Sequence, residues 1–227
     1  GAGVSELIRL AALSFLKARA LTLKHTYGEY EVAAKIIGAR IKRVEMPGMQ
    51  IYPERIIEHM ARDDVVFLCN PNNPTGQYLG RKELEALIEK AERVDALVVL
   101  DEAYVDFVRD AHSSHDFIPS ARNLVILRSL TKSFAIPGVR VGYAISSVEH
   151  INAMRSIKAP WSVGVFAQKI GAAAIADTDF LAVTSDKIEQ SKRRMENQLG
   201  ESDVLIRSDA NFYIVDVGNG KNVKRAL

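Results

Sequence analysis

The chain is 227 residues long, which fits one large domain or one domain with part of a second, and its 48% of hydrophobic residues is enough for a sizeable buried core. The 30 Lys and Arg residues nearly balance the 28 Asp and Glu residues, so the net charge of +2 points to no nucleic-acid or membrane partner. The single cysteine, Cys69, excludes an internal disulfide, and no apolar run approaches the roughly 20 residues of a membrane span. A cytoplasmic protein is therefore expected.

Short apolar segments alternate with helical patterns along the first two thirds of the chain. Apolar residues at helical spacing predict helices over Ser5–Lys17, Tyr30–Ile37 and Arg81–Arg93. Extended or apolar runs predict strands at Ile41–Glu45, Val65–Cys69, Leu97–Leu100, Leu124–Leu127 and Val141–Ile145. Because such alternation is typical of a mainly parallel sheet covered on both faces, the pattern predicts an α/β fold.

The character of the chain changes after Ser146. Helices are predicted over Val148–Ile157, Val163–Ala176 and Phe180–Leu199, followed by a strand over Asn211–Val217 and a helix from Asn222 onward. A long polar helix followed by a new strand predicts a boundary near Asp177, hence a domain over 1–176 and a second segment over 177–227. The first residue is not Met, the first residues already form a glycine-rich turn into a helix, and the last predicted helix stops before any cap. We therefore expect the first domain to be N-terminally incomplete and the second segment to be a linking helix with the incomplete start of a small domain.

Three predicted strands run directly into polar clusters. Residues 70–76 read Asn-Pro-Asn-Asn-Pro-Thr-Gly, residues 101–104 read Asp-Glu-Ala-Tyr, and residues 128–133 read Arg-Ser-Leu-Thr-Lys-Ser. Each cluster alone has an ordinary reading as a turn or a helix cap. Ligands in α/β sheets lie beyond the carboxyl ends of the strands, so the three clusters together predict one site.

In this order and spacing, the clusters resemble those of the fold-type-I aminotransferases (class I/II), which depend on pyridoxal 5'-phosphate (PLP). The resemblance covers essentially the whole chain and includes Gly-Val-Arg-Val-Gly at 138–142. It implies an aspartate-aminotransferase-like large domain with a mainly parallel seven-stranded sheet between helices, and part of a small α+β domain. It also implies a PLP cofactor and a homodimer.

The resemblance assigns roles around the cofactor ring. Lys132 would form the Schiff base with PLP and then move a proton at the substrate α-carbon. Asp101 would pair with the pyridine nitrogen and keep it protonated. Asn73 and Tyr104 would both hydrogen-bond the phenolate oxygen of the ring, and Tyr27 would stack on the ring.

The resemblance also implies a phosphate cradle. Arg140 would grip the phosphate through two hydrogen bonds, with hydroxyl contacts from Ser129 and Thr131. The chain begins with a glycine-rich turn into a helix, whose free N–H groups and dipole would face the phosphate. The residues concerned are Gly3, Val4 and Ser5.

Other polar and aromatic residues have less specific patterns. His112 and His115, with Asp116 beside them, favour a solvated loop over a metal site, because no third ligand or rigid element is evident. Trp161, at a helix entrance, fits equally a residue that lines the site and one that only packs.

Within the family, the chain is most similar to histidinol-phosphate aminotransferases and threonine-phosphate decarboxylases. Tyr-Gly-Glu-Tyr at 27–30 and Ser-Asp-Ala-Asn-Phe at 208–212 suit both, whereas the segments 130–138 and 159–163 favour the decarboxylases. Gly164 replaces an expected substrate-contacting side chain, often Asn, so the amino-acid or amino-phosphate substrate stays open. We expect an aminotransferase that uses Lys132; the alternatives are a PLP-dependent threonine-phosphate decarboxylase of the cobalamin-biosynthesis type and, more remotely, a non-catalytic α/β domain.

Overall fold

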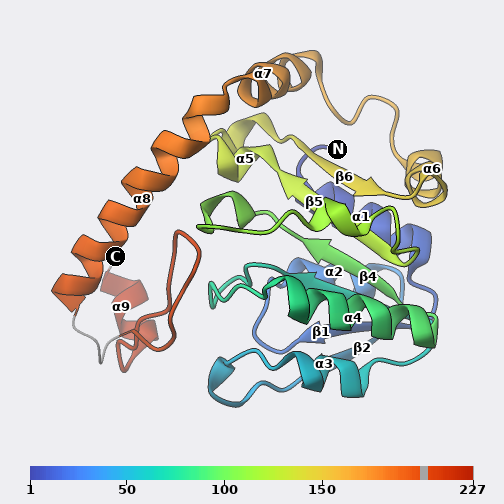
Figure 1. Cartoon of the computed structure of the whole chain (residues 1–227), viewed down its shortest axis with the longest axis horizontal. Helices are drawn as coiled ribbons and strands as arrows, with labels where there is room; N and C mark the ends of the chain where they lie inside the picture. Colours follow the sequence, from blue (N-terminus) through green and yellow to red (C-terminus); the bar gives the residue numbers. More distant parts are fainter. Residues whose placement is uncertain (200–203, 227) are drawn as a thin grey trace.

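A six-stranded sheet with strand order β2-β1-β3-β4-β5-β6 organises the computed structural model, which describes residues 1–199 and 204–226 (Figure 1). Strands β1 to β5 are mutually parallel, and β6 runs antiparallel to β5. The strands are β1 (Arg19–Leu23), β2 (Arg40–Val44), β3 (Asp64–Cys69), β4 (Leu97–Asp101), β5 (Leu124–Ser129) and β6 (Gly142–Ser146). The predicted α/β fold with a mainly parallel sheet is therefore confirmed.

The helices cover both faces of this sheet and then extend away from it (Figure 1). The longer helices are α1 (Val4–Phe15), α2 (Glu29–Ile36), α4 (Arg81–Val94), α6 (Val148–Ile157), α7 (Val165–Ala176) and α8 (Thr178–Leu199). Shorter ones are α3 (Pro53–His59), α5 (Leu130–Ser133), α9 (Gly220–Ala226) and the 3-10 turns Pro47–Met49, Val105–Phe107, Ser114–Phe117 and Pro137–Val139. Within the described part of the chain, no helix combines the length and the apolar character that a membrane crossing requires.

Strand β3 shows why the sheet needs helices on both faces. Val66 and Leu68 enter a core that contains residues of α3 and α4, whereas Val65, Phe67 and Cys69 enter the core formed with α1 and α2. Side chains alternate between the two faces of a strand, so a strand that is apolar at every position must be buried on both.

Two strand predictions need correction. The residues 19–23 were not predicted as a strand, yet β1 pairs with both β2 and β3. The predicted strand over Asn211–Val217 is wrong: in the described residues, Val215 forms only an isolated antiparallel bridge with Val204. One bridging partner cannot build a ladder, so the remaining residues stay irregular.

The sheet contains six strands among the described residues, one fewer than the seven expected from the family resemblance. At the outer edge of β6, the Gly1 amino group donates to Gly142 O at 2.9 Å, and Gly142 N donates to Gly1 O at 3.1 Å. The outer edge of β6 is thus paired only with Gly1 in the described part of the chain.

The end of α7 and the start of α8 coincide with the predicted boundary near Asp177. Helix α7 ends at Ala176, and α8 then runs along one side of the molecule toward α9 (Figure 1). The division into 1–176 and 177–227 stays a prediction, and residues 200–203 and 227 of the second segment lie outside the described residues.

Candidate active site

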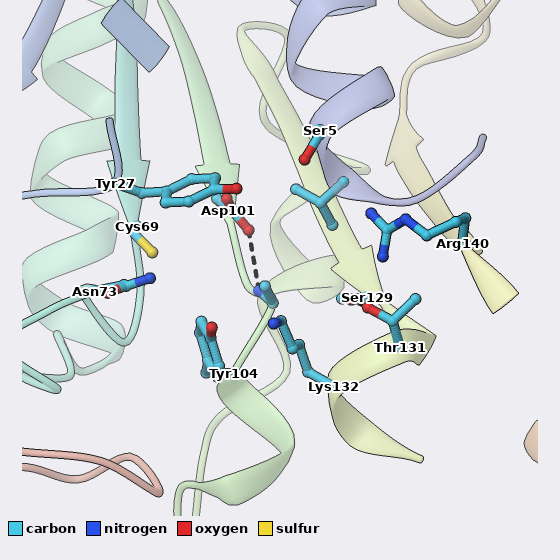
Figure 2. Close-up of a pocket in the computed structure, with 12 residues that line it drawn as sticks. Ser5, Tyr27, Cys69, Asn73, Asp101, Tyr104, Ser129, Thr131, Lys132 and Arg140 are labelled. Carbon is cyan, nitrogen blue, oxygen red and sulfur yellow. Dashed lines mark hydrogen bonds between the residues drawn. The ribbon is translucent and has the colours of Figure 1, made fainter. Parts of the chain in front are cut away.

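A pocket lies beyond the carboxyl ends of β3, β4 and β5, and most of the predicted site residues line it (Figure 2). Those that line it are Val4, Ser5, Tyr27, Asn73, Asp101, Tyr104, Ser129, Thr131, Lys132 and Arg140. Gly3, the remaining predicted residue, lies directly behind Arg140. Cys69 and Ala103 also line the pocket and were not predicted.

Asp101 is the last residue of β4 and is 2% exposed. Its Oδ1 accepts a hydrogen bond from the backbone N–H of Ala103 at 3.0 Å, and its Oδ2 accepts one from the hydroxyl of Tyr30 at 2.8 Å. Burial raises the pKa of Asp101 to about 6, although both hydrogen bonds favour the anion and lower it. A carboxylate has about four acceptor sites, so it can still accept a hydrogen bond from a ligand.

Lys132 lies in the single helical turn α5, which begins where β5 ends. Its amine is 5.6 Å from the centre of the Tyr104 ring (Figure 2). The Ser133 hydroxyl donates to Ser129 O at 2.8 Å and also bonds the Asp106 carboxylate. These bonds fix the turn that carries Lys132 relative to the end of β5.

A buried ion-pair cluster joins the ends of β4 and β5. Arg128 lies 3.1 Å from Glu102, whose side chain is 1% exposed, and also pairs with Asp106. Burial raises the pKa of Glu102, and Arg128 opposes this by stabilising the anion. Asp101 lies at the end of β4 and Lys132 follows the end of β5. The cluster therefore fixes the Asp101 carboxylate and the Lys132 amine relative to one another.

The loop at 70–76 positions the aromatic side of the pocket. Asn72 donates to His25 O at 2.9 Å and accepts from the Thr26 hydroxyl at 2.7 Å, which ties the loop to the segment that carries Tyr27. Tyr104 also lines the pocket, and burial raises its pKa to about 12, so its hydroxyl is protonated at neutral pH and can donate to a ligand.

The other end of the pocket is built to receive an anion. Helix α1 begins at Val4 without a side-chain cap, so its first N–H groups are available to a ligand. Gly3 has φ 81°, and a Cβ there would lie 2.6 Å from Nη2 of Arg140, so only glycine fits. The Ser129 and Thr131 hydroxyls, 2.8 Å apart, add further donors.

Two aromatic residues near the pocket had no predicted role. The Tyr30 hydroxyl donates to Asp101 from outside the pocket lining, and Phe212 meets the Tyr104 ring edge-to-face at 4.8 Å between ring centres. Both belong to segments that the family resemblance had selected, at 27–30 and 208–212. A sequence pattern identifies such segments, but it does not show which side chain reaches the site.

The remaining sequence candidates lie outside the pocket. Among the described residues, no group of three or more His, Cys, Asp and Glu side chains could hold a metal ion. His112 instead accepts or donates a hydrogen bond with Tyr78, and His115 is 3.5 Å from Asp116. Trp161 is 90% exposed and does not line the pocket.

Comparison with known sequences identifies a family and several relatives. The family described as aminotransferase class I and II matches residues 1–227. Histidinol-phosphate aminotransferase 2 of Archaeoglobus fulgidus is 35% identical over 219 residues, which are 95% of this chain and 62% of the relative. A protein of Caldanaerobacter subterraneus subsp. tengcongensis, named as a candidate threonine-phosphate decarboxylase, is 32% identical and is matched over 97% of this chain and 62% of its own length.

Solved structures agree with this result. The histidinol-phosphate aminotransferase of Sinorhizobium meliloti, determined in complex with pyridoxal-5'-phosphate, has a TM-score of 0.88 at 25% identity and is matched over 63% of its length by all of this chain. The chain spans about 62% of the length of the curated relatives described above. With the whole chain matched by the family description, this protein belongs to the aminotransferase class I and II family.

Proposed function

We propose that this protein is a PLP-dependent aminotransferase that acts on an amino acid or a phosphorylated amine, similar to histidinol-phosphate aminotransferases. The observation that carries the proposal is the pocket itself, which combines a lysine, a buried aspartate and an anion cradle. The family and the S. meliloti relative with PLP support it.

The residues of the pocket fit PLP at both ends. The cradle of Gly3, the α1 N-terminus and Arg140 suits the phosphate, because a side chain at Gly3 would fill the space that Arg140 occupies. At the other end, the buried carboxylate of Asp101 has acceptor capacity left for a protonated ring nitrogen. When bound, PLP supplies an electron sink for negative charge at the substrate α-carbon.

The protein supplies the proton transfer and the positioning. Lys132 would hold the cofactor covalently until the amine of the substrate displaces it. The freed Nζ would then carry the proton between the substrate α-carbon and the cofactor. Asp101 would keep a proton on the ring nitrogen, and Tyr104 and Asn73 would both donate hydrogen bonds to the ring oxygen. Phe212 packs edge-to-face against Tyr104 and supports the position of its ring.

The proposal includes a homodimer in the cytoplasm. Helix α7 is mostly apolar, yet only Gly171 of its residues is buried, whereas Phe166 is 81% and Val165 61% exposed. An apolar helix face of this kind is typical of a surface that a partner covers. Phe166→Glu is therefore expected to shift the protein from dimer to monomer in analytical ultracentrifugation, whereas a wild-type protein that sediments as a monomer would contradict the dimer.

The second candidate is a PLP-dependent threonine-phosphate decarboxylase. It is favoured by the C. subterraneus relative and by the segments 130–138 and 159–163. The two candidates share the cofactor site and differ in the bond that is broken, so product analysis separates them. A non-catalytic α/β domain is the remaining alternative, and it predicts no lysine-bound cofactor at all.

The central test is the identity of the cofactor lysine. After incubation with PLP and borohydride reduction, mass spectrometry is expected to find the pyridoxyl group on Lys132. Lys132→Ala should abolish turnover, while Lys158→Ala, beyond the end of α6, should leave it unchanged. Labelling of another lysine in the wild-type protein, or no labelling, would overturn the proposal.

The same preparation identifies the reaction. Histidinol phosphate with 2-oxoglutarate should yield glutamate if the protein is an aminotransferase. Threonine phosphate should instead release carbon dioxide if it is the decarboxylase.

A further inference from the structure

Tyr30 is a polar residue whose burial is complete. It lies in the first turn of α2 and is 0% exposed, and its hydroxyl donates to Oδ2 of Asp101 at 2.8 Å. A buried hydroxyl that bonds a charged acceptor is worth more than one that bonds a neutral group. The hydrogen bond between Tyr30 and Asp101 should therefore be stronger when the Asp101 carboxylate is ionised.

Neighbouring aromatic rings fix the Tyr30 ring. It stacks on Phe67 with 5.4 Å between ring centres and 11° between planes, and Tyr27 meets it edge-on at 5.7 Å and 83°. The hydroxyl lies on the axis about which a tyrosine ring flips, so ring flips leave it in place. Tyr30 thus contacts both Tyr27 and Asp101, two residues with proposed roles at the cofactor ring.

The hydrogen bonds of Asp101 show what Tyr30 contributes. In the described residues, the Tyr30 hydroxyl is the one side-chain donor to this carboxylate, and the other donor is the backbone N–H of Ala103. Cys69, Glu102 and Tyr104 also lie close enough to interact electrostatically with Asp101, and none of them is a cation. Stabilisation of the Asp101 anion by the protein therefore depends on Tyr30 and one backbone group.

We propose that Tyr30 is a positioning residue for the reaction: its hydroxyl orients Asp101 and holds it as the anion that keeps the cofactor ring nitrogen protonated. This inference rests on the proposed function, since it requires PLP in the pocket. The Tyr30 hydroxyl, which Tyr30→Phe removes while keeping the ring, acts on the reaction through Asp101. Its removal should therefore change the protonation of the ring nitrogen as well as the rate.

The test is Tyr30→Phe in the holoenzyme, with Tyr52→Phe as the matched control. Tyr52 precedes α3, is 39% exposed and is outside the pocket. Tyr30→Phe should lower kcat about 10- to 100-fold, the range for losing a hydrogen bond to a charged group. It should also move the ¹⁵N resonance of PLP labelled at the ring nitrogen toward the unprotonated position, whereas Tyr52→Phe should change neither.

A double-mutant comparison separates positioning from a structural role. If Tyr30 acts through Asp101, adding Tyr30→Phe to Asp101→Asn should leave the ¹⁵N resonance and the PLP dissociation constant as they are in Asp101→Asn alone. A Tyr30→Phe holoenzyme with a wild-type ¹⁵N resonance would overturn the inference, even if its thermal stability fell. A wild-type protein that carries no PLP on Lys132 would instead refute the proposed function, so the two failures are distinguishable.

Discussion

The buried carboxylate of Asp101 should lower the free energy of unfolding of the cofactor-free protein at neutral pH. The side chain is 2% exposed, and its two hydrogen-bond donors, Tyr30 and Ala103, are neutral. Asp101→Asn removes the charge but keeps the shape, and an amide can retain both contacts because a hydroxyl can either donate or accept. We expect this substitution to stabilise the cofactor-free protein at neutral pH.

The magnitude follows from the pKa of Asp101. Burial raises it from 3.8 to about 6, so ionisation at neutral pH costs the folded state on the order of 3 kcal/mol relative to the unfolded chain. Because the folded-state pKa lies above the unfolded one, this cost is fully present above pH 6. It disappears as the pH falls from about 6 toward 4, where the carboxyl is protonated in both states. The advantage of Asp101→Asn should therefore be largest at pH 8 and small at pH 4.5.

Urea unfolding of the cofactor-free proteins at pH 8, 6 and 4.5 measures this difference. Asp179→Asn, on the exposed first turn of α8, is the matched control and should change the free energy of unfolding by less than about 0.5 kcal/mol. The reasoning is refuted if Asp101→Asn is no more stable than wild type at pH 8, or if its advantage does not shrink at low pH. Saturating PLP should reduce or reverse the stability difference between Asp101→Asn and the wild type, because a protonated ring nitrogen stabilises only the ionised aspartate.

Three further predictions concern the surroundings of the pocket. Gly3→Ala should cost about 1–3 kcal/mol of stability and weaken PLP binding, because φ is 81° and the new Cβ would collide with Arg140. Calorimetric titration measures the PLP affinity, and an unchanged affinity would contradict a phosphate site at Gly3 and Arg140. Arg128→Ala should destabilise by about 3–5 kcal/mol in urea unfolding, since it leaves Glu102 buried without its cation, and a loss below about 1 kcal/mol would contradict a buried pair. Cys69 should react with Ellman's reagent only after unfolding, because burial raises the pKa of its thiol; rapid reaction of the native protein would contradict its burial.

The candidate site was largely predictable because the carboxyl ends of parallel strands lie at the same edge of the sheet. The clusters at 70–76, 101–104 and 128–133 follow β3, β4 and β5, and these strands are neighbours in the sheet. Polar residues that directly follow neighbouring parallel strands must lie near one another, whatever connects the strands. The placement of Asn73, Asp101 and Lys132 around one pocket therefore needed only the strand assignments and their order.

Residues that depend on packing between distant segments were not predictable in the same way. Tyr30 reaches Asp101 across 71 positions of sequence, and its partner rings come from different elements. Strand β1 was missed because its apolar stretch is short, and pairing on both edges, which the sequence does not display, makes it a strand. At 211–217 the opposite holds: the residues suit a strand, but in the described chain they find a single bridging partner.

Two adjacent buried carboxylates show how the same local sequence produces a structural group and a candidate functional group. Glu102 is paired with Arg128, so its charge is compensated within the protein. Asp101, one residue earlier, forms no ion pair with a Lys, Arg or His of the described residues and is held only by neutral donors. Among the described residues, Arg128 pairs with the Glu102 side chain and forms no ion pair with Asp101. The charge that remains uncompensated lies in the pocket, opposite an anion cradle that contains Arg140. A ligand with a cationic ring and an anionic arm would satisfy both ends of the pocket at once.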